Sequence, residues 1–171
     1  MEEPLMTEEP RYAIYPIKHH DVWALYEKHQ SSFWLAKEID YTADLNDWER
    51  LTPDERFFVE NVLAFFAESD GIVSENINLN FLNDITWNEV KSYYSFQNTM
   101  ENIHNETYSL LIDTLVKDPE RKASLFNAIK TIPVVRKKAE WAKQWMNRTA
   151  PFAKRLVAFA IVEGIFFSGS F

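Results

Sequence analysis

Glu101 and His104 are the two residues of this sequence whose types and spacing most directly suggest chemistry. They stand at positions i and i+3 of a segment with helical periodicity, so both side chains project from one face about one turn apart. Helical bundles use this Glu-x-x-His arrangement to hold a metal ion. Burying a carboxylate and an imidazole is costly unless something pairs with them, and a metal ion satisfies both. The spacing therefore predicts a metal site, with Tyr108 one further turn along the same face.

The helix that must carry this pair is predicted from Trp87 to Leu115. Alternate steps of three and four residues trace one unbroken stripe along it, as expected for one side of a helix. The members of the stripe are Trp87, Val90, Tyr94, Gln97, Glu101, His104, Tyr108, Leu111 and Leu115. The residues at both ends of the stripe are typical of a protein core, whereas those in its middle are polar. The pattern therefore predicts a functional site on the buried face of this helix.

A second solitary acid, Asp70, interrupts the apolar stripe of another predicted helix. That helix begins sharply at Thr52-Pro53-Asp54-Glu55, which combines a capping box with proline at the first helical position. Taken alone, Asp70 is best interpreted as a cap or a kink beside Gly71. The stripe consists of Phe58, Val62, Phe66, Asp70, Val73 and Ile77.

A third acid, Glu163, occupies the same kind of position in the last predicted helix, which begins near Thr149 and Pro151. The stripe there is Phe152, Leu156, Phe159, Glu163, Phe166 and Ser170. Three solitary acids on three helices, joined by a histidine and a tyrosine, are best explained by one shared site where the helices face each other. Carboxylate oxygens with an imidazole suit iron or manganese, and zinc less well because no sulfur ligand is present.

The composition favours a single all-helical domain. The chain has 171 residues, of which 46% are hydrophobic, and this suffices for one substantial core. It contains only three glycines, and few stretches alternate as strands do. A net charge of -8 without a long basic run disfavours binding to nucleic acid or to an anionic membrane surface.

The sequence also indicates the cellular setting. No cysteine is present, which excludes disulfides, thiolate metal sites and thiol nucleophiles. The N-terminus lacks the basic and apolar regions of a signal peptide. The most apolar stretch, Leu156 to Phe167, is too short to span a membrane and contains Glu163. We therefore expect a soluble, cytoplasmic protein.

The remaining segments are predicted from their prolines, caps and periodicity. Residues 1–16 should form an extended, mobile arm, because three prolines oppose regular structure, and residues 17–171 should form the domain. Thr86-Trp87-Asn88-Glu89 has the pattern of a capping box that opens the central helix. Shorter helices are predicted over residues 20–29, 120–132 and 134–147, with Pro133 between the last two.

Several side chains outside the stripes receive simple interpretations. Three tryptophans are predicted to anchor the core: Trp34, Trp141 and Trp145. Three histidines in polar surroundings are predicted to be solvated: His19, His20 and His29. Three lysines are assigned to a solvated helix face: Lys137, Lys138 and Lys143.

Four segments together resemble the small subunit of class I ribonucleotide reductase, and its eukaryotic and large-DNA-virus branch most of all. The resemblance extends from about Tyr12 to the last residue, and its motifs are far more specific than an isolated Glu-x-x-His. The segments are Phe33-Trp34, the run Ala64 to Val73, the run Glu101 to Asp113, and the run Val162 to Phe171.

The resemblance implies a ferritin-like helical bundle and a role for each matched residue. Asp70, Glu101 and His104 match ligands of a di-iron centre, and Glu163 matches a ligand of the second iron. Tyr108 matches the tyrosine that the oxygen-activated centre oxidises to a stable radical. Trp34 matches the tryptophan through which an electron enters. In the family, the radical passes to a cysteine of the large subunit, where ribonucleotides are reduced to deoxyribonucleotides.

The sequence departs from the family in one respect. The second Glu-x-x-His of a complete site lies, in the family, beyond the Ser-Gly-Ser-Phe segment that ends this sequence. We therefore expect a bundle that is incomplete at its C-terminus and inactive until a second fragment supplies the missing ligands. The completed protein is expected to form a homodimer and to bind the large subunit.

Two other functions remain open at this point. One is a different ferritin-like di-iron oxidase or oxygenase, from which Tyr108 together with Trp34 distinguishes this chain. The other is a non-catalytic, structural partner of a small subunit. Replaced ligands would mark such a partner, and every matched ligand in this sequence is intact.

Overall fold

The computed structural model describes residues 3–9 and 11–171, and within them the chain is helical and contains no strand. This confirms the predicted all-α class. The α-helices are α1 (His20–Gln30), α2 (Leu45–Arg50), α3 (Pro53–Asn76), α4 (Leu82–Asp84), α5 (Asn88–Leu115), α6 (Pro119–Leu125), α7 (Ala128–Thr131), α8 (Pro133–Gln144) and α9 (Phe152–Ile161). Two short 3₁₀ segments, Pro4–Met6 and Ala36–Glu38, and two π-helical segments, Ile77–Phe81 and Val162–Phe166, complete the order.

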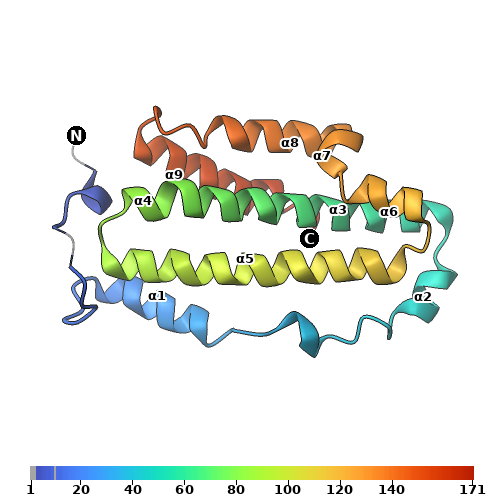
Figure 1. The fold of residues 1–171 in the computed structure, drawn as a ribbon, viewed down its shortest axis with the longest axis horizontal. Coiled ribbons are helices and arrows are strands. Elements are labelled where there is room, and N and C mark those ends of the chain that lie inside the picture. The colour runs from blue at the N-terminus through green and yellow to red at the C-terminus, as the bar shows by residue number, and fades with distance from the viewer. Residues whose placement is uncertain (1–2, 10) are drawn as a thin grey trace.

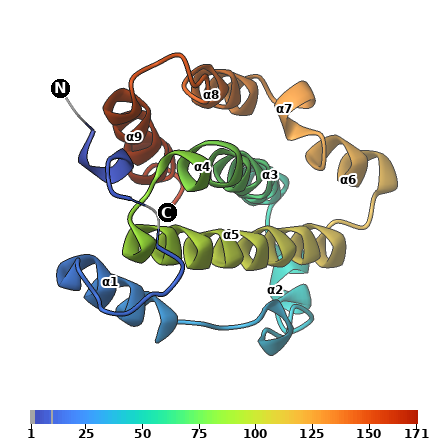
Figure 2. The same ribbon diagram turned by 60° about the vertical axis from the view of Figure 1, so that its left-hand side comes forward.

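The long helices α3 and α5 run antiparallel through the middle of the molecule (Figure 1). Helix α5 lies between α3 on one side and α1 on the other, while α8 and α9 cover the far side of α3 (Figure 2). The core between these helices is built from apolar side chains of α3, α5 and α9, among them Phe66, Val73, Ile77, Ile112 and Phe159. The arrangement brings the polar middles of the predicted stripes toward one another.

Helix α3 begins as the sequence predicts. The Thr52 hydroxyl accepts a hydrogen bond from the Glu55 N–H at 3.3 Å, and the Glu55 carboxylate accepts one from the Thr52 N–H at 2.8 Å. Pro53 occupies the first helical position. The reciprocal cap satisfies two donors that the helix itself leaves without partners.

The capping box predicted at Thr86 does not form. Trp87 is the N-cap residue of α5, and no side chain caps that end. The Thr86 hydroxyl instead accepts from the Glu8 N–H at 3.1 Å and donates to the Leu5 carbonyl at 3.1 Å. Glu89, which should have closed the box, lies fully buried and pairs with residues of the N-terminal arm.

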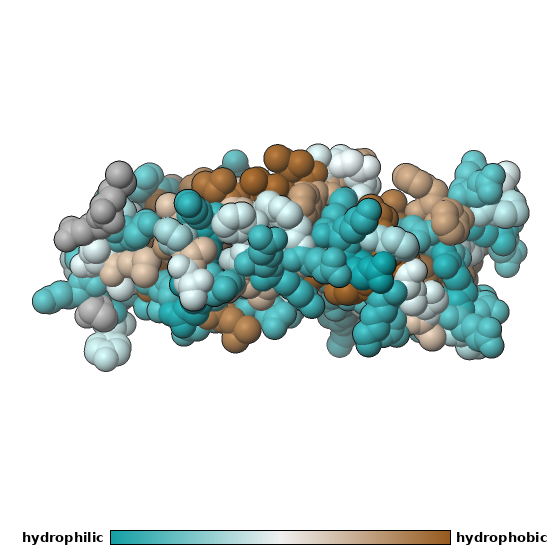
Figure 3. Space-filling view, turned by 90° about the horizontal axis from the view of Figure 1, so that it is seen from above, coloured by the Kyte–Doolittle hydropathy of each residue, from teal (hydrophilic) through white to brown (hydrophobic). Residues whose placement is uncertain are grey.

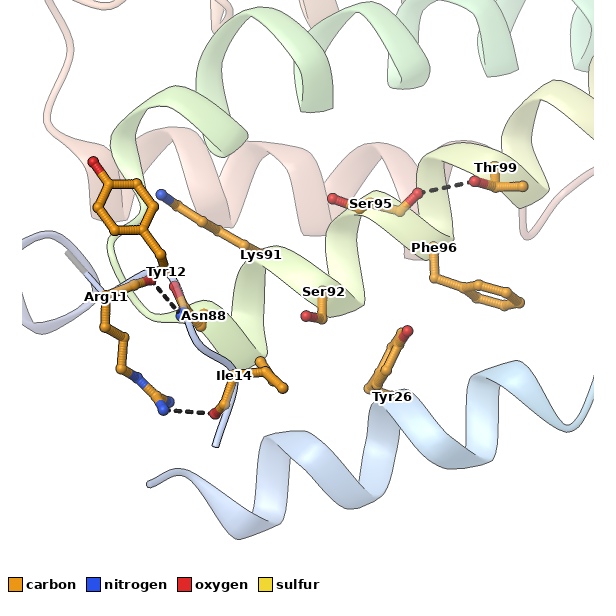
Figure 4. Close-up of a pocket in the computed structure, with 10 residues that line it drawn as sticks. All are labelled: Arg11, Tyr12, Ile14, Tyr26, Asn88, Lys91, Ser92, Ser95, Phe96 and Thr99. Atoms are coloured by element: carbon orange, nitrogen blue, oxygen red, sulfur yellow. Dashed lines mark hydrogen bonds between the residues drawn. The ribbon is translucent and has the colours of Figure 1, made fainter. Parts of the chain in front are cut away.

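The described residues of the arm fold back against the start of α5. The guanidinium of Arg11 donates to Glu89 and to the Ile14 carbonyl, and the Asn88 amide donates to the Arg11 carbonyl at 2.7 Å. An open pocket of about 580 Å³ lies between this part of the arm, Tyr26 of α1 and one face of α5 (Figure 4). Pro10 lies outside the described residues, and the predicted mobility of the arm stays a prediction.

Replacing Glu89 with alanine should destabilise the protein by about 3–5 kcal/mol, because the partly buried guanidinium of Arg11 would lose its carboxylate. Burial raises the pKa of Glu89, but hydrogen bonds from the Lys18 N–H and from Arg11 outweigh it and hold the pKa at about 2. A lowered pKa gives stability that is present above the ordinary value of 4.5 and is lost as the pH falls from there toward about 2.

Urea unfolding near pH 7 and at acid pH measures both effects. The control is Asp47→Asn, because Asp47 forms an ion pair with Arg50 that is mostly exposed on both sides and should contribute at most about 1 kcal/mol. Equal effects of the two substitutions would show that Glu89 does not anchor the arm.

Two of the helix predictions differ from the structure at their boundaries. The single helix predicted over residues 120–132 is divided into α6 and α7, because Asn127 has a non-helical backbone conformation. The Thr131 hydroxyl donates to the Ser124 carbonyl at 2.7 Å and holds the two short helices together. Helix α8 begins at Pro133 and ends at Gln144, earlier than the predicted residue 147.

The predictions of solvated side chains were wrong at three positions. His19 stacks on Trp87 with ring centroids 3.4 Å apart, and its Nε2 lies 3.0 Å from a Glu8 oxygen. His29 packs against Tyr93 and Phe96 of α5, whereas His20 is exposed.

The third exception is a lysine. Lys138 is half-buried, lies over the Phe65 ring and donates to the Phe166 carbonyl at 2.7 Å. Lys137 and Lys143 are exposed as predicted. In each exceptional case an aromatic ring from a distant part of the chain covers the residue, which local composition does not reveal.

Apolar surface remains at the outside of the bundle. The stripe of α3 includes Phe58, which is 65% exposed and not part of the core. A space-filling view from above shows hydrophobic side chains gathered along one long edge (Figure 3). Exposed apolar side chains of α9 and the segment after it are Val157, Ile165 and Phe171. None of the helices within residues 3–9 and 11–171 combines the length and apolar character needed to cross a membrane.

Candidate metal centre

The structure brings together three of the four predicted metal ligands. Asp70 of α3 faces Glu101 and His104 of α5, and one possible ligand atom from each residue lies within 4.8 Å of the others. The two helices run side by side, so residues in the middle of each buried stripe meet. An Oε2 atom of Glu101 lies 3.3 Å from Nδ1 of His104, as the i, i+3 spacing predicts.

Glu163 reaches the same region through Gln97. Gln97 stands one turn before Glu101 on α5, and its Nε2 donates to Glu163 Oε1 at 3.0 Å. The same amide nitrogen lies 3.4 Å from Glu101 Oε1. Gln97 belongs to the predicted stripe of α5, but the sequence assigned it no function.

The backbone around Glu163 is π-helical, with the segment Val162–Phe166 continuing α9. A π-helical turn holds more residues than an α-helical turn, and such turns are frequent at functional sites. The consequence is visible in the burial of the phenylalanines that follow, because Phe167 is buried while the predicted core residue Phe166 is only half-buried. After Glu163, the buried position of the apolar stripe is therefore shifted by one residue, from Phe166 to Phe167.

The acids of this cluster lie in an environment that favours their neutral forms. Asp70 is only 4% exposed, and its Oδ2 has no hydrogen-bond partner among the described residues. Burial and the nearby charges of Glu101 and Glu163 raise the pKa of Asp70 to about 8. Burial and the charge of Glu101 likewise raise the pKa of Glu163 to about 7, although the Gln97 hydrogen bond opposes this rise.

A metal cation fits this set of donors. It would provide the missing partner of Asp70 Oδ2 and would offset the repulsion among the three carboxylates. Carboxylate oxygens and one imidazole are ligands that iron and manganese accept. The residues that could hold such cations are Asp70, Glu101, His104 and Glu163.

Metal uptake by this cluster should release protons. Asp70 and Glu163 hold their protons up to pKa values of about 8 and about 7, whereas bound carboxylates must be ionised. Affinity should therefore rise steeply as the pH increases from about 6 to about 8. Without metal the sign is opposite for folding: because the unfolded carboxyls ionise at their ordinary pKa values of 3.8 and 4.5, stability falls as the pH rises from about 4 and levels off above the folded pKa values of about 7 and about 8.

Calorimetric titration with Mn²⁺ in two buffers of different ionisation enthalpy measures the released protons. Urea unfolding of the metal-free protein over the same pH range provides the second measurement. Equal affinity at both ends of the range, with no proton release, would contradict the prediction.

The surroundings of Tyr108 are aromatic. Its ring stacks on Phe66 with centroids 5.0 Å apart, and Phe66 in turn stacks on Phe167 and Phe171. Burial and the charges of Asp70 and Glu101 raise the pKa of Tyr108 to about 12, so its phenol is neutral at physiological pH. The sequence did not predict that Phe167 and Phe171 would stack on Phe66, because this contact depends on how the last segment turns.

Trp34 lies beside the histidine of the cluster. The two rings have centroids 5.8 Å apart, and Trp34 packs against a small group of apolar residues that includes Met100 and Ile103. It is therefore both a packed side chain, as the sequence predicts, and a direct neighbour of His104.

Comparison with known proteins identifies the family of this chain. The family described as "Ribonucleotide reductase, small chain" matches residues 11–171. The ribonucleoside-diphosphate reductase small chain of Monkeypox virus is 54% identical over 170 residues, which cover 99% of this chain and 53% of the relative. That of Neurospora crassa is 56% identical over 172 residues, covering 99% of this chain and 42% of the relative.

A solved structure agrees with these relatives. The ribonucleotide reductase Rnr4 homodimer from Saccharomyces cerevisiae superposes with a TM-score of 0.83 at 40% identity, covering 96% of this chain and 52% of that chain. The helices thus have the predicted ferritin-like arrangement, and the chain spans about half the length of the relatives it matches. Because the family match includes all but the first ten residues, this chain belongs to the ribonucleotide reductase small-chain family.

Proposed function

We propose that this chain carries the radical tyrosine and four metal ligands of a radical-generating small subunit of ribonucleoside-diphosphate reductase. One observation carries the proposal: Asp70, Glu101 and His104 each place a possible ligand atom within 4.8 Å of the others, and Asp70 Oδ2 has no hydrogen-bond partner among the described residues. Tyr108 lies one turn along α5 from His104. Family membership supports it, since the relatives are named as small chains of this enzyme.

The proposed resident cofactor is a pair of iron ions, with manganese as the alternative. Asp70, Glu101 and His104 would hold one cation, and Glu163 would serve the second. When bound, iron supplies the capacity to use dioxygen as an oxidant. The protein contributes a buried, anionic set of ligands that selects for divalent cations over neutral molecules.

Tyr108 is the proposed radical site. A neutral phenol must lose both one electron and its proton to become a tyrosyl radical, and the raised pKa keeps that proton on the oxygen until oxidation occurs. Phe66, whose ring stacks on that of Tyr108 and on that of Phe167, is proposed to limit the access of water and external reductants to the half-buried Tyr108. Trp34, whose ring centroid lies 5.8 Å from that of His104, is proposed to be the route by which an external reductant supplies one electron toward the reduction of dioxygen, while Tyr108 supplies another and becomes the radical.

We further propose that residues outside this sequence complete the centre. The matched relatives are about twice as long, and the exposed apolar side chains Val157, Ile165 and Phe171 offer a surface on which further helices could pack. That portion would supply the second Glu-x-x-His. The completed subunit is proposed to form a homodimer and to pass its radical to the large subunit, which reduces ribonucleotides to deoxyribonucleotides.

Aerobic reconstitution with ferrous iron tests the proposal. Iron content and the electron paramagnetic resonance spectrum should be measured for this chain alone and with the second half of a family member added. A tyrosyl radical that forms only after the addition would support the proposed division of ligands. Failure of both samples to bind iron would overturn the proposal, and a radical in the chain alone would show that the remaining ligands lie within these residues.

A further inference from the structure

Gln97 makes the contact that joins Glu163 to the rest of the acidic cluster. Its Nε2 lies 3.0 Å from Glu163 Oε1 and 3.4 Å from Glu101 Oε1, so one neutral amide group approaches two carboxylates. Gln97 is half-buried, and it comes from α5 whereas Glu163 comes from the π-helical segment after α9. The contact therefore spans 66 positions of the sequence.

Other amide side chains of α5 have different partners. Asn98 accepts hydrogen bonds from Ser74 and from Asn78, and Asn102 donates to the Asn98 carbonyl at 2.9 Å. These contacts link α5 to α3 or remain within α5. Gln97 is thus distinguished from its neighbours, since both acceptors of its amide are acids assigned to the metal site.

Gln97 contacts only one of the two oxygens of each carboxylate. On Glu101, Oε1 faces Gln97 while Oε2 faces His104. On Glu163, Oε1 is the oxygen held by Gln97, and no hydrogen bond to Oε2 occurs within the described part of the chain. An amide N–H₂ has two protons to donate, so it can hold both acids without adding charge.

We propose that Gln97 is a positioning residue that fixes the Glu163 carboxylate for the second cation. The inference rests on the proposed function. By holding Oε1, Gln97 leaves Oε2 available as a ligand and sets the orientation of the carboxylate. The first cation, which Asp70, Glu101 and His104 would hold, depends less on Gln97, because its amide nitrogen lies farther from Glu101 Oε1 (3.4 Å) than from Glu163 Oε1 (3.0 Å). Hydrogen-bond partners of ligands commonly contribute about 10- to 100-fold to metal affinity.

Gln97→Met tests this inference, because methionine keeps the length of the side chain and removes both donors. Mn²⁺ is titrated into the full-length small chain, and free Mn²⁺ is measured by electron paramagnetic resonance. The affinity for the first bound equivalent should change much less than the affinity for the second, which should fall by about 10- to 100-fold. A purely structural role would not separate the two equivalents.

The matched control is Gln144→Met, which makes the same chemical change at an exposed glutamine at the end of α8. It should leave both equivalents unchanged. The inference would be overturned if Gln97→Met bound both equivalents with unaltered affinity. It would also be overturned if both equivalents bound more weakly to the same extent and the melting temperature fell. Neither result would affect the proposed function. No metal uptake by the unmodified protein would overturn the proposed function, and the inference with it.

Discussion

Glu101→Ala is expected to abolish stable metal binding. Glu101 connects the other three proposed ligands, since it contacts His104 directly, lies in the group with Asp70 and meets Glu163 through Gln97. Loss of an outer hydrogen-bond partner costs about 10- to 100-fold in metal affinity, so loss of this ligand should cost at least about 100-fold. Metal content after reconstitution and dialysis measures the effect.

The same substitution should not unfold the metal-free protein. The charge of Glu101 raises the pKa values of Asp70 and Glu163, so its removal relieves repulsion in a buried cluster. Thermal melting without metal should therefore show an unchanged or higher midpoint, which separates loss of a ligand from loss of the fold. Glu106→Ala provides the control, because Glu106 is an exposed acid of the same helix. Metal content equal to that of the control would refute the assigned role of Glu101.

Tyr108→Phe is expected to eliminate the tyrosyl radical while metal content stays normal. Phenylalanine preserves the stacking on Phe66 but has no phenolic oxygen from which an electron and a proton can be lost. Tyr108 is adjacent to the cluster without being one of its ligands, so removal of the hydroxyl should not weaken metal binding. In the completed subunit proposed above, the radical signal after reconstitution should fall to background, and nucleotide reduction with a large subunit should be lost.

Tyr94→Phe is the matched control for this prediction. Tyr94 lies on the same face of α5, is also buried enough to raise its pKa to about 12, and is close enough to feel the charge of Glu163. It packs against Phe81 and Phe159, away from the aromatic stack over Tyr108. A radical retained in Tyr108→Phe and lost in Tyr94→Phe would transfer the radical site to Tyr94.

The convergence of the acids could be predicted from the sequence because a single acid in an apolar stripe is costly to bury. Several such acids on different helices are best explained by one shared partner. Asp70 and Glu101 show this pattern on two neighbouring helices, and the structure places their side chains together. The patterns depend only on helical periodicity, which spans three to four residues. Both the pattern and the resemblance predict that these acids are ligands, and metal titration tests that prediction.

The capping box at Thr86 shows why other expectations were wrong. The local spacing of Thr86 and Glu89 suits a cap, but Arg11 and the Lys18 N–H are stronger partners for a buried carboxylate than the end of a helix. Those partners are more than 70 positions away in the sequence. Contacts of this kind, like the ring that covers His29, are set by tertiary packing and leave no periodic signal.

The π-helical segment Val162–Phe166 has a consequence for how gain and loss of residues should be interpreted in related chains. A turn that contains an additional residue is equivalent to a single-residue insertion accommodated within a helix. Deletion of one residue there would restore an α-helical turn, and the side chains after it would keep their orientation, because the π turn absorbs the additional residue. Phe167 would then stay in its stack with Phe66. Relatives that lack one residue at this point are therefore expected to keep this stack, whereas loss of one residue from the regular turns of α9 would rotate the later side chains by about 100°.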